Sequence, residues 1–78
     1  MDGIKAAHRA ALYKLALEVA RAKSRGQRTM EVKAAGMIAG YLDALQVEDQ
    51  ITQAERMAAF REYRTRLPEV LIREGRVI

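Results

Sequence analysis

The sequence contains no cysteine and only one histidine, His8. Without cysteine, no disulfide can stabilise the fold and no thiolate can act as a nucleophile or as a metal ligand. A single histidine cannot build a histidine-based metal cluster. The lack of cysteine also fits a cytoplasmic location, where thiols are kept reduced and disulfides are rare.

Proline is nearly absent too, since Pro68 is the only one. The rest of the chain is rich in Ala, Leu, Glu, Arg and Met, which are the residues that favour helix. No run alternates β-branched or aromatic residues with polar ones, as a half-buried strand would. The composition therefore predicts an all-α fold.

Long apolar runs are also missing. A membrane-spanning helix needs about 18 consecutive apolar residues, and the longest uncharged central stretch, Ala34–Leu42, has about half that length. Charged residues near the N-terminus, such as Lys5 and Arg9, interrupt any signal-peptide core. We therefore expect a soluble, unprocessed chain that does not enter a membrane.

Capping residues divide the chain, as a single domain over residues 1–78, into three expected helices. The first, 2–24, is expected to end at Gly26, because glycine readily adopts the left-handed conformation that closes a helix. The second, 29–46, is expected to begin at Thr29, whose hydroxyl can accept a hydrogen bond from a free N–H of the first turn.

The third helix is expected over 52–67. It opens with the capping-box residues Thr52 and Glu55. It is expected to end before Pro68, because the residue that precedes a proline disfavours helical geometry. Pro68 then begins a short C-terminal turn over 68–74.

Short connections place successive helices antiparallel. The expected architecture is therefore a small antiparallel helical hairpin plus a third helix, a three-helix bundle that is dimeric. A rival arrangement is one long helix from Thr29 to Leu67, which would itself force dimerisation.

The first expected helix has two apolar faces, although a surface helix needs only one. His8 lies on the expected core face, with Ile4, Leu12 and Leu15, which is typical of a histidine at a core boundary or an interface. The second face consists of Ala6, Ala10, Tyr13, Leu17 and Ala20. This surplus face must contact either the third helix or another chain. We predict that Tyr13 and Leu17, with Arg61 and Arg64 of the third helix, bind a partner protein.

The second expected helix also has two such faces. The expected core face comprises Met30, Ala34, Met37, Ile38, Tyr41 and Leu45. Opposite it lie Val32, Gly36, Ala39, Gly40 and Val47. Gly36 and Gly40 each cost roughly 1 kcal/mol relative to alanine inside a helix, so their presence calls for a packing reason. Val32, Gly36, Ala39 and Gly40 are predicted either to pack tightly inside the bundle or to form the contact of a homodimer.

The formal net charge of +4 is unevenly distributed. Residues 1–28 carry seven Lys or Arg against two acidic residues, 29–55 one against five, and 56–78 six against three. Basic clusters with nearby aromatic residues can bind phosphates and stack bases. The residues of this alternative nucleic-acid surface are Arg21, Lys23, Arg25, Arg28, Arg56 and Arg66. The second helix is net acidic and suits a DNA-recognition helix poorly.

Motifs for catalysis are missing from the sequence. Ser24, the only serine, has no histidine nearby in sequence, and Glu48 and Asp49 have no second acidic pair for a metal. The segment Gly36–Gly40 lacks the ending of a phosphate-binding loop. We therefore expect no enzyme, no cofactor and no metal.

The leading prediction is a small basic helical binding protein that acts as a regulator, inhibitor or adaptor by docking onto another protein. The alternative is a nucleic-acid-binding accessory protein that uses the basic clusters. Association of the first helix with an anionic membrane surface is a third interpretation, which its small alanine side chains disfavour.

Overall fold

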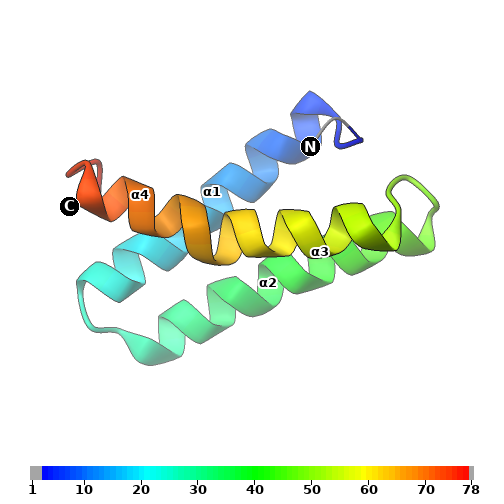
Figure 1. Cartoon of the computed structure of the whole chain (residues 1–78). Coiled ribbons are helices and arrows are strands. Elements are labelled where there is room, and N and C mark those ends of the chain that lie inside the picture. Colours follow the sequence, from blue (N-terminus) through cyan, green and yellow to red (C-terminus); the bar gives the residue numbers. More distant parts are fainter. Residues whose placement is uncertain (1–2, 78) are drawn as a thin grey trace.

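The structure is a computed structural model that describes residues 3–77. These residues form three helices and no strand, which confirms the predicted all-helical fold (Figure 1). The first two helices are α1 (Ala6–Ser24) and α2 (Arg28–Val47). The third is continuous but has three parts, α3 (Gln53–Arg61), a π-helical turn η1 (Glu62–Arg66) and α4 (Leu67–Arg73).

A tight turn joins α1 to α2. Gly26 has a φ of 68°, its N–H donates to Lys23 O, and the N–H of Gln27 donates to Ala22 O. This is the hydrogen-bond pattern of a Schellman cap, so the prediction for Gly26 is confirmed. The predicted N-cap was wrong: α2 begins directly after Gln27, so Thr29 lies inside the first turn, and no side chain caps this helix.

The expected start of the first helix at Asp2 lies outside the described residues. Within them, α1 begins at Ala6, with Lys5 as its N-cap.

A second Schellman cap ends α2, with Asp49 in the left-handed position at a φ of 58°. The chain then reverses into α3 through the predicted capping box. The N–H of Glu55 donates to Thr52 Oγ1 at 3.1 Å, and the N–H of Thr52 donates to Glu55 Oε1 at 2.8 Å. This reversal contradicts the rival arrangement of one helix from Thr29 to Leu67, because two caps separate the segments.

The sequence predicted that the third helix ends before Pro68. This prediction is wrong, because the helix continues through the proline. The N–H of Leu67 donates to Glu62 O, five residues back, so the turn before the proline is wider than an α-helical turn. In a regular α-helix the proline ring would collide with the carbonyl four residues earlier. The wider turn removes that geometry, and the helix continues to Arg73.

The third helix lies across the hairpin of α1 and α2 (Figure 1). Its first part, α3, packs on α2, and its last part, α4, packs on α1. The core between the helices contains the fully buried side chains Ile4, Leu12, Val19, Ile38, Leu42, Pro68 and Leu71. Because α4 reaches α1, the third helix seals a core that the hairpin alone would leave open.

Candidate interaction surfaces

No described segment covers the outer face of α2, which we define as Val32, Gly36, Gly40 and Val47. Val32 keeps 52% and Val47 82% of its surface exposed. A methyl group added at Gly36 or Gly40 would meet no neighbouring segment or side chain of residues 3–77 within 4 Å. One of the two predictions was that the glycines pack tightly inside the bundle. This prediction is wrong, because open space lies above both glycines. Ala39, at the edge of this face, is half-buried.

Beside the outer face, a groove of about 330 Å³ runs between α1 and α2. We call it the methionine groove; it is lined by Lys14, Leu15, Glu18, Met30, Lys33, Ala34 and Met37. Met30 and Met37 were expected in the core, but they remain 50% and 54% exposed. They lie toward the edge of α2, where α1 carries the charged side chains of Lys14 and Glu18 instead of an apolar cover.

The structure does not assemble the predicted patch of Tyr13, Leu17, Arg61 and Arg64. At 100° per residue, Tyr13 and Leu17 share a side of α1 with Ala20. Ala20 is fully buried on the helix against which α4 packs, and Tyr13 and Leu17 are half-buried.

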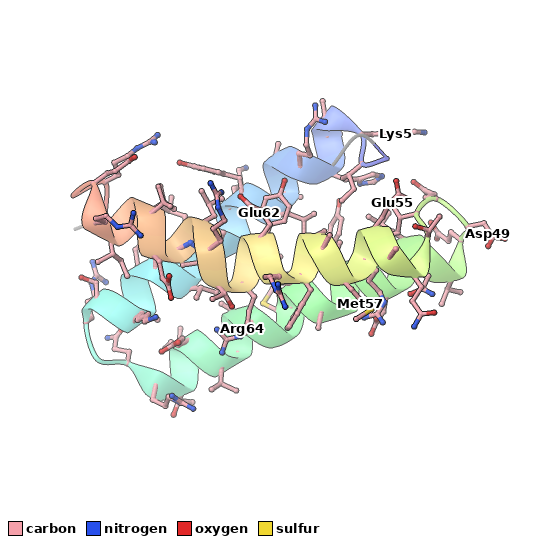
Figure 2. All side chains as sticks on the ribbon, in the orientation of Figure 1. Lys5, Asp49, Glu55, Met57, Glu62 and Arg64 are labelled. Carbon is pink, nitrogen blue, oxygen red and sulfur yellow. The ribbon has the colours of Figure 1, made fainter. Side chains whose placement is uncertain are left out.

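On the third helix, Arg61 is exposed, and Arg64 extends toward α2 while Glu62 extends toward α1 (Figure 2). Arg64 therefore points away from α1, the helix that carries Tyr13 and Leu17 (Figure 2). The continuation of the helix through Pro68 was not expected, and it packs both η1 and α4 along α1.

Part of the predicted basic surface does come together at the turn between α1 and α2. Arg21 and Arg25 line a hollow of about 580 Å³ there, and Arg76 from the C-terminal end of the chain joins them. Sequence reasoning missed Arg76, because only the return of α4 along α1 brings it there. Lys23 and Arg28, exposed near the same turn, extend this basic end of the molecule. Two carboxylates partly neutralise the positive charge of this end. Arg21 Nη1 lies 4.0 Å from Glu18 Oε1, and Arg76 Nη1 lies 3.4 Å from Glu74 Oε1.

The other two residues of the predicted basic surface lie elsewhere and have intramolecular partners. Arg56 donates from Nε to Gln46 Oε1 at 2.5 Å and lies 3.5 Å from Asp43. Arg66 Nη1 donates to both carboxylate oxygens of Glu62, at 3.2 Å to Oε1 and at 2.9 Å to Oε2. They therefore do not extend the basic surface at the turn between α1 and α2.

His8 lies at the edge of the core, where it joins α1 to the far end of α2. Its Nδ1 is 2.7 Å from the Tyr41 hydroxyl, and its Nε2 is 3.1 Å from Gln50 Oε1. An amide oxygen only accepts hydrogen bonds, so Nε2 carries a proton, and the Nδ1 of a neutral ring accepts from Tyr41. Gln50 in turn donates to Glu48 Oε1 at 2.8 Å. These contacts link two distant segments.

Within residues 3–77, no group of three or more His, Asp or Glu side chains lies close enough to hold a metal ion. None of the helices in the same range combines the length and the apolarity that crossing a membrane requires. No family model, no curated protein and no solved structure matches the chain.

Proposed function

We propose that this chain is a small, non-enzymatic helical binding protein that docks onto another protein through the methionine groove. The observation that carries this proposal is the half-exposed position of Met30 and Met37 beside an apolar floor of Leu15 and Ala34. Methionine is unbranched and polarisable, and it adapts to the shape of what it binds. Grooves of this kind accept the apolar face of an amphipathic helix.

Charge at the groove indicates which helix fits. Lys14 and Lys33 line it, and neither forms an ion pair within the described part of the chain. The acidic residue of the groove, Glu18, already lies near Arg21. A helix that carries Asp or Glu beside its apolar face would complement the two lysines, which favours correct partners and faster association. The proposed ligand is therefore an amphipathic helix with acidic borders, on a partner that this chain regulates or inhibits.

Affinity capture from the native host tests the proposal with two matched variants. Met37→Glu places a charge in the groove, whereas Met57→Glu places the same charge on an exposed position of α3 outside it. We expect a protein that is retained by the wild type and by Met57→Glu but is lost with Met37→Glu. Retention of the same proteins by all three forms would overturn the groove as the docking site.

We also propose that two copies of the chain associate through the outer face of α2. This face is uncovered, and Gly36 and Gly40 leave open space above the helix that no described segment fills. Light scattering at tens of micromolar is the direct test. A mass of two chains is expected, and a mass of one chain over the whole concentration range would remove this part of the proposal.

A second candidate function is nucleic-acid binding at the basic end of the molecule. The observation in its favour is the hollow at which Arg21 and Arg25 from the end of α1 meet Arg76 from the C-terminal end of the chain. A gel-shift assay with short duplex and single-stranded probes decides it. Affinity that falls steeply with salt, and that weakens in Arg76→Gln, would support it. Unchanged migration at low salt would rule it out.

A further inference from the structure

Side chains on the outer side of α2 are arranged symmetrically about Ile38. Ile38 itself is fully buried and points into the core, so the direction opposite to it is the centre of the outer face. Gly36 and Gly40 lie two residues before and after this centre. Lys33 and Asp43 lie five residues before and after it. The pattern is therefore symmetrical in position and opposite in charge.

The angular positions follow the same symmetry. At 100° per residue, the glycines lie about 20°, and Lys33 and Asp43 about 40°, on either side of the direction opposite Ile38. The dimer axis that lies at right angles to both α2 and this direction exchanges the two ends of α2 and leaves each flank on its own side. It therefore brings Lys33 of one copy level with Asp43 of a second copy, and Gly36 level with Gly40, and a crossing of the two helices turns the members of each pair toward one another.

We infer that two copies of this chain pair through the outer faces of α2 in an antiparallel orientation, with Lys33 of each copy facing Asp43 of the other. This inference rests on the proposed self-association and specifies its geometry. A contact of this kind uses the same patch on both subunits, and closed twofold dimers are the commonest oligomers.

The two glycines supply the close approach. Packed helices usually have axes roughly 8–10 Å apart, and small residues spaced four apart allow a shorter separation. Within residues 3–77, nothing occupies the space above Gly36 and Gly40, so the single chain gains no packing in return for their low helix propensity. Contact with the backbone of a second α2 gives that packing, and the exposed Val32 and Val47 extend it toward the ends of the helix.

Charge selects the orientation. Lys33 has no ion-pair partner among residues 3–77. Asp43 lies 3.5 Å from Arg56 but keeps 63% of its side chain exposed, so it can accept a second cation. In a parallel pair, by contrast, Lys33 would face Lys33 and Asp43 would face Asp43. Like charges that face each other across an interface are unfavourable, so the antiparallel orientation is preferred.

Charge reversal on the intact chain tests this geometry. Lys33→Asp and Asp43→Lys each replace two attractive contacts with two repulsive ones, and we expect each to weaken the dimer at least about 10-fold. The double variant restores opposite charges and should recover most of the affinity. Lys5→Asp, at the exposed N-cap position of α1, is the matched control and should leave the dimer unchanged. Circular dichroism of each variant verifies that it is folded.

Single cysteines give the orientation independently, because the chain has none of its own. Gly36→Cys mixed with Gly40→Cys should form a mixed disulfide under mild oxidation, and neither alone should cross-link efficiently. A monomeric wild type would overturn self-association and this inference together. A dimer that is insensitive to both reversals, or that cross-links Gly36→Cys to itself, would leave self-association standing and overturn the antiparallel arrangement.

Discussion

The hydroxyl of Tyr41 lies 2.7 Å from Nδ1 of His8, and the two rings meet edge to face with centroids 5.6 Å apart. This contact joins residues that are 33 positions apart in the sequence. It fixes the N-terminal half of α1 against the C-terminal half of α2, where the loop residue Gln50 binds the other nitrogen of the same ring. These two hydrogen bonds of His8 therefore hold α1 and α2 together at the end of the hairpin opposite the turn.

Tyr41→Phe should therefore destabilise the fold by about 1 kcal/mol, because it removes one hydroxyl and leaves Nδ1 of His8 without its partner. Tyr13→Phe is the matched control: the half-buried Tyr13 makes no side-chain hydrogen bond within the described residues, and its substitution should have little effect. Urea unfolding at neutral pH measures both values. Equal effects of the two substitutions would contradict a specific role for the Tyr41 hydroxyl.

Asp49→Gly should stabilise the protein by about 1 kcal/mol. Asp49 has a φ of 58° at the C-terminal cap of α2, and residues other than glycine lose roughly 1–2 kcal/mol in this left-handed conformation. The substitution also removes a negative charge from the negative end of the helix dipole. Asp49→Ala removes the same charge but keeps the backbone strain. In thermal unfolding, Asp49→Gly should therefore have a higher melting temperature than Asp49→Ala. Equal melting temperatures would show that the positive φ at this position costs no stability.

Alkaline pH should unfold the protein partly through Tyr63. Burial raises the pKa of this hydroxyl above its ordinary value; the nearby Arg9 lowers it, and Glu62 raises it further. The folded state therefore holds the Tyr63 proton more tightly than the unfolded chain does. The resulting stabilisation is complete below a pH of about 10, the ordinary tyrosine pKa, and is lost as the pH rises through the higher folded-state pKa.

Melting temperatures of the wild type and of Tyr63→Phe, measured between about pH 8 and 11.5, test this assignment. The wild type should lose stability more steeply above about pH 10, because only it carries the titrating hydroxyl at this position. Parallel curves for the two proteins would show that Tyr63 has the same pKa folded and unfolded.

Leu71→Ala should destabilise the fold by about 2–5 kcal/mol, the usual range for a fully buried leucine. Leu71 lies in α4, the segment after Pro68 that packs on α1. Met57→Ala, at an exposed position of α3, should change the free energy of unfolding by less than about 0.5 kcal/mol. A small effect of Leu71→Ala in urea unfolding would show that α4 is not part of the cooperative core.

Local sequence was sufficient to predict the end of the first helix and the start of the third. Gly26 adopts a positive φ and closes α1, and Thr52 and Glu55 form the capping box of α3. Such caps are hydrogen bonds between residues a few positions apart, so the residues that form them are visible in the sequence. The surplus of apolar side chains on α2 was visible for the same reason, since helical periodicity is local.

Which apolar residues are covered was decided by tertiary structure alone. The local rule at Pro68 predicted an end to the third helix, yet the π turn carries it on to bury Leu71 on the α1 side. Met30 and Met37 fit a core pattern, yet they border an open groove. Burial depends on segments that are distant in sequence, and the energy of packing them outweighs single-residue preferences. For this reason the sequence determined that the chain is helical and placed the caps at Gly26 and Thr52, whereas only the assembled fold decided which faces of α1 and α2 remain available to a partner.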